Sequence, residues 1–283
     1  MKIGVTGATG QLGVKVIKEL KEKISTDQIV ALVRSPKKAA DLGVEVRSFD
    51  YNEPDIMVES LKDIDKLLLI SSNEIGKRLE QHTNVIEAAQ KAGVKFIAYT
   101  SLLHAETSSL VLAGEHVETE KVLKSIEIPF TILRHGWYTE NYTNSIYGAI
   151  AGGVLLGSSG DGKISSATRD DFAKAAAEVL TSEGHEGKTY ELAGDEAFTM
   201  SDMAAEIAQQ TGKNIVYKNL PVAEYATALE NAGLPEGIAQ FLAGTHVSTE
   251  KGDLFDSSHQ LSQLIKKPTT SLAQAIADAL AGL

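Results

Sequence analysis

The segment that most constrains the fold is a glycine-rich turn between a short β-branched run, residues 3–6, and an amphipathic stretch that begins at residue 11. Gly7, Gly10 and Gly13 stand there at G-x-x-G-x-x-G spacing. In such a junction the first glycine permits a tight turn, the second lets backbone N–H groups approach a pyrophosphate, and the third lets helix and strand pack closely. The spacing predicts a dinucleotide at the helix N-terminus, where free N–H groups favour phosphate. A tight turn without a ligand is the alternative. The expected contacts in this segment are Thr6, Gly7, Thr9, Gly10, Gln11, Leu12 and Gly13.

The first half of the chain repeats this strand-and-helix unit. The expected strands are residues 3–6, 29–34, 44–49, 66–71, 96–101 and 130–134, and the expected helices are residues 11–23, 56–61, 79–92 and 115–125. Short β-branched runs that alternate with amphipathic stretches are typical of βαβ units. We therefore predict an α/β fold with a Rossmann-like, doubly wound parallel sheet.

The second half has a different pattern. After Asn141 the alternation gives way to a glycine-punctuated, loop-rich stretch with one apolar run, residues 154–156. A helix over 169–180, a strand over 189–192, a helix that starts at Thr199 or Ser201 and a mostly helical remainder follow. We expect an NADP-binding Rossmann-like domain over 1–145 and a smaller, mostly helical substrate domain over 146–283, with some segments of the latter returning to the Rossmann sheet.

Composition excludes several functions. The chain has 27 Lys and Arg against 38 Asp and Glu, a formal net charge of −11, which disfavours a nucleic-acid partner. It has no cysteine, so disulfides, thiolate catalysis and Cys-ligated metals are ruled out. The apolar runs are too short to span a bilayer, and the first residues lack a signal-peptide pattern. We expect a cytoplasmic protein without a membrane span.

The end of the second expected strand indicates which dinucleotide binds. NAD sites usually carry an Asp or Glu there, which bonds the ribose 2′-hydroxyl. This chain has Arg34, with Lys37 and Lys38 nearby. A guanidinium can hold a 2′-phosphate with two hydrogen bonds, so we predict NADP(H), bound in part by Arg34 and Lys38. The alternative is a set of solvated charges that open a helix, although basic residues there oppose the helix dipole.

Three further residues follow expected strands at the edge where such folds bind ligands. Asp50 comes after the third strand and is expected at the adenine. Ser71 and Ser72 come after the fourth strand. Serines at such positions also cap loops, so the two serines are candidates for either role.

The catalytic pattern of short-chain dehydrogenases is missing. None of the eight tyrosines has a lysine four residues later. On the helix after the fifth strand, where that pair would lie, stand His116 and Lys121, which either shuttle a proton or form the exposed face of an amphipathic helix. Neither the zincin histidine spacing nor a G-x-S-x-G elbow occurs. These absences disfavour metal-assisted hydrolysis and serine acyl transfer.

The motifs above belong to a wider resemblance that covers nearly the whole chain. Residues 6–13, 33–34, 68–72, 99–102, 134–142, 160–164, 167–169, 190–195 and 252–256 are similar to the NmrA-like atypical short-chain dehydrogenases. Within that group the resemblance is greatest to the bacterial quinone oxidoreductases that use NADPH. The glycine motif is shared by the superfamily, whereas the Gly-Trp-Tyr-x-Glu-Asn string at residues 136–141 is much narrower.

The resemblance implies an activity and further site residues. It implies NADPH across the carboxyl edge of the sheet, a quinone that enters from the smaller domain, and hydride transfer between them without a flavin or a metal. It places Trp137, Tyr138, Asn141 and Arg169 beside the cofactor. For the reduction of a quinone, water and the Tyr138 hydroxyl are then the two candidate proton donors. Loss of the Tyr-x-x-x-Lys pair is normal in this family. Two alternatives remain: a non-catalytic NADP(H)-sensing regulator, and an NADPH reductase of another small molecule. A homo-oligomer is also left open.

Overall fold

A computed structural model of the protein describes residues 1–282. Its main feature is a seven-stranded sheet with the order β3-β2-β1-β4-β5-β6-β8. The strands are β1 (Ile3–Thr6), β2 (Ile29–Val33), β3 (Glu45–Ser48), β4 (Lys66–Leu69), β5 (Phe96–Leu102), β6 (Phe130–His135) and β8 (Thr189–Leu192). Every neighbouring pair is parallel, so all seven carboxyl ends lie at one edge. The predicted doubly wound Rossmann-like sheet is confirmed.

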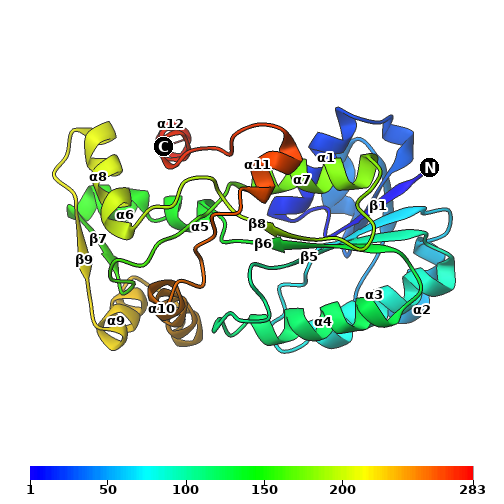
Figure 1. Cartoon of the computed structure of the whole chain (residues 1–283), viewed down its shortest axis with the longest axis horizontal. Coiled ribbons are helices and arrows are strands. Elements are labelled where there is room, and N and C mark those ends of the chain that lie inside the picture. The colour runs from blue at the N-terminus through cyan, green and yellow to red at the C-terminus, as the bar shows by residue number, and fades with distance from the viewer. Residues whose placement is uncertain (283) are drawn as a thin grey trace.

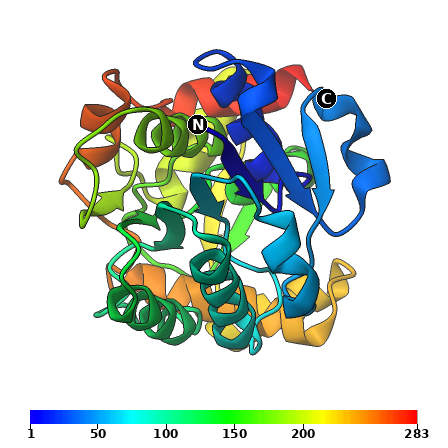
Figure 2. The ribbon, with the colours of Figure 1, turned by 90° about the vertical axis from the view of Figure 1, so that its right-hand side faces the viewer.

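Helices cover both faces of this sheet (Figure 1). On one face lie α1 (Gln11–Lys21), α7 (Arg169–Thr181) and the short α11 (Gln260–Ile265); on the other lie α2 (Pro54–Ser60), α3 (Arg78–Ala92) and α4 (Ala113–Ser125). Each layer buries its own apolar cluster against the strands. Figure 2 views the molecule from the end that contains the large sheet, with α3 and α4 in the lower part of the picture. Burial on both faces explains why the inner strands β1, β2, β4 and β5 are rich in apolar residues, whereas the edge strands β3 and β8 are partly exposed and more polar.

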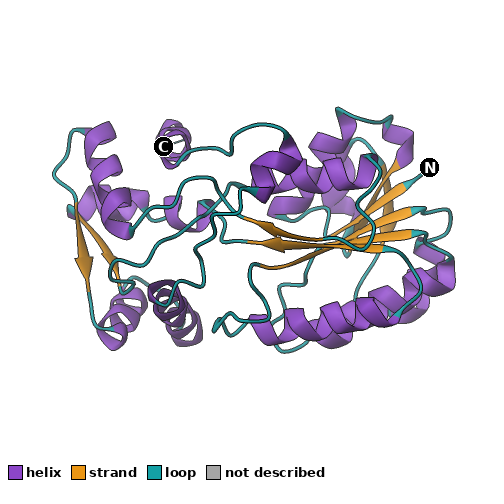
Figure 3. Cartoon of the chain, in the orientation of Figure 1, coloured by secondary structure: helices purple, strands orange, loops and turns teal. Residues whose placement is uncertain are grey.

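The rest of the chain forms a smaller unit at the other end of the molecule. A two-stranded parallel sheet, set apart from the large one in Figure 3, pairs β7 (Val154–Gly157) with β9 (Val216–Asn219). The helices around it are α5 (Glu140–Thr143), α6 (Ile146–Gly152), α8 (Met200–Thr211), α9 (Val222–Asn231), α10 (Glu236–Glu250) and α12 (Leu272–Ala281). Its largest apolar cluster includes side chains of α6, α8 and α12.

Most predicted elements occur within two or three residues of their expected bounds, and the differences have local causes. Strand β9 was not expected, because most of its residues are exposed and Lys and Asn fill half of it. Two short helices, α5 and α6, lie in the stretch expected to be loop-rich. The basic stretch after β2 forms a 3₁₀ helix, Pro36–Leu42. Of the two expected caps for α8, Thr199 is the one observed, in a reciprocal capping box with Asp202.

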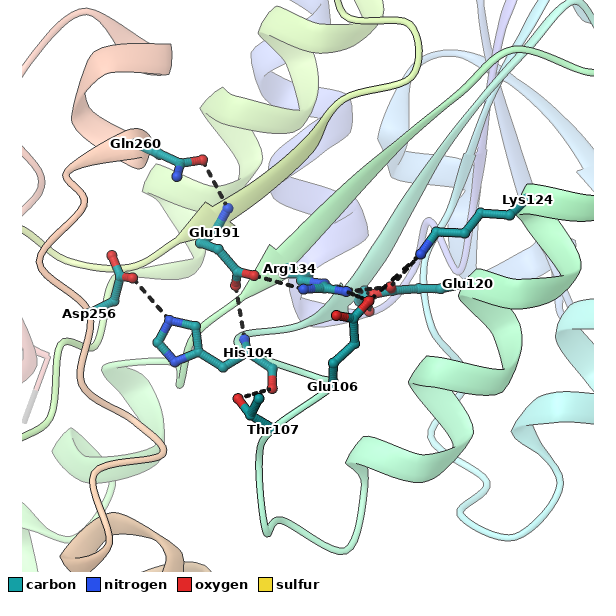
Figure 4. A network of polar contacts seen from close by, with 10 residues as sticks. His104, Glu106, Thr107, Glu120, Lys124, Arg134, Glu191, Asp256 and Gln260 are labelled. Carbon is teal, nitrogen blue, oxygen red and sulfur yellow. Dashed lines mark hydrogen bonds and ion pairs between the residues drawn. The ribbon is translucent and has the colours of Figure 1, made fainter.

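A buried arginine connects the large sheet to the loop after β5 (Figure 4). Arg134 on β6 donates to both carboxylate oxygens of Glu120 on α4, at 2.9 and 2.6 Å, and to Glu191 on β8 at 2.9 Å. It also bonds Glu106 in the loop at 3.0 Å. Glu191 in turn accepts from the backbone N–H of His104 at 2.9 Å. Because Glu120 is 1% exposed, its charge needs compensation, which comes from this guanidinium at 2.6 Å and, at the longer distance of 3.8 Å, from Lys124.

We therefore expect Arg134→Met to lower the free energy of unfolding by about 3 kcal/mol, because the buried Glu120 carboxylate would keep only Lys124, 3.8 Å away, as a cation. Urea titration followed by circular dichroism measures this change. Lys121→Met is the matched control, because Lys121 is on α4, the helix that carries Glu120, and forms an exposed ion pair with Glu118. We expect this substitution to change the free energy of unfolding by no more than about 0.5 kcal/mol. Equal effects of the two substitutions would contradict the role given to Arg134.

Candidate functional site

A cavity of about 560 Å³ lies at the carboxyl ends of β1, β2, β3 and β4. Strand order reverses between β1 and β4, and open parallel sheets bind ligands at such a switch point. Segments from all four strand ends contribute to its wall. The lining residues are Gly7, Thr9, Gly10, Gln11, Leu32, Val33, Arg34, Ser35, Lys38, Phe49, Asp50, Tyr51, Ile70, Ser71, Ser72, Asn73, Glu74 and Gln81.

The glycine-rich turn forms one end of the cavity. Gly7 has φ of +58°, which side-chain-bearing residues rarely adopt, and its carbonyl accepts from the N–H of Gly10 at 2.8 Å. Helix α1 then starts directly, with Gly10 as its N-cap. The N–H groups of the first helical turn have no partner inside the helix, and residues 11–14 carry no acidic side chain that would compete for them. This end is therefore suited to a phosphate group.

Three of the residues expected to contact the dinucleotide instead support the turn from the protein interior. A Cβ on Gly13 would lie 2.3 Å from the Gly7 carbonyl oxygen, so Gly13 is needed for the packing of α1 on the turn. Leu12 packs into the core under α1. Thr6 is fully buried; its hydroxyl donates to the Leu68 carbonyl at 3.0 Å and accepts from the Ile70 N–H at 2.9 Å. In the described part of the chain these three residues lie outside the cavity wall, and Thr6 ties β1 to β4.

The part of the cavity wall that follows β2 carries positive charge. Arg34 and Lys38 both line it, close to Asp50. The Arg34 side chain is 60% exposed and lies 3.4 Å from Glu74 in an ion pair. Such an exposed pair contributes little stability, so a phosphate can replace the carboxylate at small cost. Asp50 accepts from the backbone and side-chain N–H groups of Asn52, at 3.0 and 3.1 Å, and thereby shapes the loop after β3.

Ser71 and Ser72 belong to the part of the wall that the loop after β4 contributes. The Ser71 N–H donates to the hydroxyl of Thr100 at 2.9 Å, and the Ser72 N–H donates to Nε2 of His82 at 3.0 Å. Ser72 also accepts from Arg78, whose Nε lies 2.7 Å from the serine carbonyl oxygen. Within residues 1–282 the buried Ser71 hydroxyl has no hydrogen-bond partner. Because buried hydroxyls are normally bonded, this one suits a polar group of a ligand.

The residues expected beside the other half of a dinucleotide lie after β6, at the same sheet edge. The Arg169 guanidinium stacks over the Tyr138 ring at 4.2 Å, donates to Asn141 at 3.1 Å and pairs with Glu140 at 3.2 Å. Trp137 packs between the apolar clusters of the smaller unit and of the β5–α4 loop. These side chains form one group, which lies outside the lining of the 560 Å³ cavity in the described chain.

Tyr138 has a desolvated environment with two cations near it. Burial raises the pKa of Tyr138 to about 12, and the charges of Arg169 and Arg78 oppose that rise. Its hydroxyl lies 3.4 Å from Nδ1 of His135. That imidazole stacks on Phe172 with ring centroids 4.3 Å apart, and burial lowers the pKa of His135 to about 3. Tyr138 therefore keeps its proton near neutral pH and has a neutral base beside it.

The expectation that His116 belongs to an exposed helix face is wrong. His116 is only 5% exposed, so it is not part of an exposed helix face, and its Nδ1 lies 2.8 Å from the Tyr99 hydroxyl. Burial first, and then the charge of Arg78, lower the pKa of His116 to about 3. Lys121 does lie on the exposed face, 2.7 Å from Glu118. The polar residues of α4 thus divide between solvent and a buried network that the sequence pattern did not reveal.

The sequence pattern of the NmrA-like family matches residues 1–275. The chain belongs to the NmrA-like family. Quinone oxidoreductase 2 of Escherichia coli is 54% identical over 277 residues, 97% of each chain. The structure of the NADPH-dependent quinone oxidoreductase from Escherichia coli complexed with NADPH has a TM-score of 0.96 at 53% identity and covers 98% of this chain and 99% of its own. Citrobacter sp. triphenylmethane reductase complexed with NADP(H) has a TM-score of 0.95 at 38% identity, with 98% and 100% covered.

For this NmrA-like chain, sequence reasoning missed part of the cavity wall. Tyr51, Asn73, Glu74 and Gln81 line it without having been expected. Tyr51 directly follows Asp50, and Glu74 is two residues after Ser72. Their positions just after strand ends could have indicated that they line the cavity. Gln81 lies on α3 and reaches the wall only through the packing of that helix. The residues described show no group of three metal-ligating side chains, and none of their helices is long and apolar enough to cross a membrane.

The buried histidines of this NmrA-like protein predict a pH dependence of stability. Burial lowers the pKa of His82, His116 and His135 to about 3, whereas an unfolded histidine titrates near 6.5. Below pH 6.5 the unfolded chain therefore binds more protons, and stability falls as the pH falls toward 3.

We expect the free energy of unfolding to decrease between pH 6.5 and pH 5 by up to about 1.4 kcal/mol per pH unit for each histidine. Urea titrations at pH 7, 6 and 5 measure the slope. His135→Phe, which keeps a ring on Phe172, is expected to reduce it by the share of one histidine. A slope near zero in the parent protein would show that these groups are protonated in the folded state.

Proposed function

We propose that this protein is an NADPH-dependent oxidoreductase that transfers hydride to a quinone. The observation that carries the proposal is a cavity at the carboxyl ends of β1 to β4 whose wall includes both the glycine turn and the cations Arg34 and Lys38. The near-full-length likeness to Quinone oxidoreductase 2 supports the choice of substrate. The proposed activity draws on a cellular NADPH pool, which we take to be cytoplasmic.

The cavity fits the cofactor segment by segment. In this proposal the helix N-terminus behind Gly10 and Gln11 holds the pyrophosphate. Arg34 and Lys38 hold the 2′-phosphate, and for this the Arg34 side chain exchanges Glu74 for the phosphate. The buried Ser71 hydroxyl, on the wall contributed by the loop after β4, takes a further polar group of the cofactor. Bound NADPH would supply the hydride, and the protein supplies orientation and electrostatics.

The residues after β6 would border the reacting end. We propose that the group around Tyr138 and Arg169, with Trp137 and Asn141, faces the nicotinamide and the quinone. Reduction of a quinone to a quinol needs one hydride and one proton, or the hydride alone if the product leaves as the monoanion. Tyr138 is protonated at neutral pH, and Arg169 above its ring stabilises the phenolate that remains after proton donation. Water is the alternative donor.

The same proposal gives the two parts of the chain their roles. Residues 1–145 form the NADP-binding part, and the smaller part, within residues 146–283, admits the quinone. Helix α7, strand β8 and helix α11 belong to the second range in sequence but pack on the large sheet. We therefore assign these three elements to cofactor binding and the remaining helices with the β7–β9 pair to the substrate.

We expect the purified protein to oxidise NADPH only when a benzoquinone or naphthoquinone is present, and to do so faster than with NADH. Loss of NADPH absorbance, measured over a panel of both quinone classes with NADH run in parallel, gives this result. Tight binding of NADPH without turnover on any quinone would overturn the enzymatic proposal in favour of a sensor. Turnover confined to another acceptor would leave the cofactor assignment and remove the quinone.

Arg34→Ala separates the two cofactors. We expect its KM for NADPH to rise by about 10- to 100-fold, the effect of losing charge-assisted hydrogen bonds to one phosphate, with less than about threefold change for NADH. Lys37→Ala is the matched control, because Lys37 is a neighbouring cation outside the cavity wall in the described chain. Its KM for both cofactors is expected to stay near that of the parent. Equal losses with NADPH and NADH in Arg34→Ala would refute the 2′-phosphate assignment.

A further inference from the structure

Behind the cavity wall formed by Ser72, a chain of hydrogen bonds runs into the space between α3 and α4. The Ser72 N–H donates to Nε2 of His82 at 3.0 Å. Nδ1 of the same ring lies 2.9 Å from the Thr119 hydroxyl, which donates to the Glu115 carbonyl at 2.8 Å. His82 and Thr119 are both fully buried. A loop residue on the cavity wall is thus connected to the backbone of α4 through two side chains.

The direction of every bond in this chain follows from its ends. A backbone N–H can only donate, so Nε2 of His82 must be the acceptor and carries no proton. Nδ1 of the neutral ring then holds the proton and donates to Thr119, whose own proton is used for the Glu115 carbonyl. Burial and the charge of Arg78 lower the pKa of His82 to about 3, in agreement with a neutral ring. One tautomer of His82 therefore satisfies the entire chain.

Arg78 holds the second backbone group of Ser72, its carbonyl. Its Nε donates to the Ser72 carbonyl at 2.7 Å, and its Nη1 lies 3.4 Å from Nε2 of His116. Because a guanidinium only donates, Nδ1 of His116 carries the proton and donates to the Tyr99 hydroxyl at 2.8 Å. The backbone N–H of Arg78 is itself held by Glu115 at 3.0 Å. Both polar backbone groups of Ser72 are therefore bonded to buried side chains of α3.

We propose that His82 is a positioning residue for cofactor binding: through its bond to the Ser72 N–H, it sets the orientation of the β4–α3 loop on the cavity wall. The inference rests on the proposed function. His82 does not line the cavity in the described chain, so it acts through Ser72. Buried polar groups of this kind cost free energy unless they are fully bonded, and a network that is fully bonded holds one geometry. Apolar side chains would fill the same space without directing the loop.

The geometry also says which replacements keep this function. Removal of the acceptor leaves the Ser72 N–H free to turn toward the cavity, where it changes the wall that the cofactor meets. A glutamine side chain offers a carbonyl oxygen near the place of Nε2, so His82→Gln retains an acceptor. His82→Leu retains the bulk and no acceptor. The pair therefore separates hydrogen bonding from packing at one position.

The test is titration of NADPH into the purified full-length protein, followed by nucleotide fluorescence, with steady-state kinetics on a quinone in parallel. We expect His82→Leu to raise the Kd and the KM for NADPH by about tenfold, the scale of one lost hydrogen bond to a buried group, with kcat within about threefold. His82→Gln is expected to return the Kd to within about threefold of the parent. The KM for the quinone should stay unchanged in both.

His185→Leu is the matched control, because His185 bonds Ser182 and Tyr190 at the opposite edge of the sheet, before β8. Its Kd for NADPH should equal that of the parent. Thr119→Val, which removes the acceptor of the His82 Nδ1 proton, is the second test if His82→Leu does not fold, and we expect a rise in Kd of about threefold.

An unchanged Kd in folded His82→Leu or Thr119→Val overturns the positioning role. Equal increases for leucine and glutamine also overturn it, because packing alone would then explain the effect. Failure of the proposed function is a separate result, seen in the parent protein: NADPH binding without turnover on any quinone would remove the quinone and leave the Kd comparison of the variants valid. A parent protein that bound no NADPH would overturn both proposals.

Discussion

The contact between Gly13 and the carbonyl oxygen of Gly7 is the constraint on which the candidate site depends. No side chain fits there, since a Cβ would lie 2.3 Å from that oxygen and 2.7 Å from the Cα of Ala8. The close approach fixes the direction in which α1 leaves the turn, and so fixes where its first N–H groups point. It also allows α1 to lie on β1, where Val16, Ile17 and Leu20 complete one apolar layer. Core packing and ligand geometry are therefore set by the same contact.

Part of the cavity wall is positively charged although the molecule as a whole is negatively charged. The chain is acidic, with a formal net charge of −11, yet Arg34 and Lys38 line the cavity. Glu74 balances Arg34 from 3.4 Å in an exposed position, where screening by water keeps the attraction small. If a carboxylate of the protein bound the arginine tightly, it would compete with the phosphate, and the affinity for the phosphate would fall. An exposed pair avoids this loss and still limits repulsion between Arg34 and Lys38.

The parts of the site that the sequence predicted are those with a local signature. The glycine turn carries its spacing within seven residues, and Arg34 stands at the end of a recognisable strand. His82 and His116 have no such signature, because a histidine on an amphipathic helix looks the same whether its face meets solvent or another helix. Only the packing of α3 against α4 brings both rings together with Tyr99. Strand β9 was missed for a related reason: its pairing partner, β7, is about sixty residues away in sequence, and its own residues are mostly polar.

The position of Tyr138 links the two parts of the fold. Its segment leaves β6, and the Thr139 N–H donates to the Ala167 carbonyl at 2.9 Å, just before α7 begins. The backbone N–H of Arg169, the first residue of α7, donates to Glu140 at 2.9 Å. The Arg169 side chain that covers the Tyr138 ring is thereby anchored on the helix that packs against α1.

The smaller unit begins at this junction, because α5 and α6 continue directly from it. The Tyr138 ring and the Arg169 guanidinium over it therefore lie where the two parts of the fold meet. The glycine turn is set by another contact, the close approach of Gly13 to Gly7. The turn that is suited to phosphate and the environment of the Tyr138 hydroxyl thus rest on different contacts.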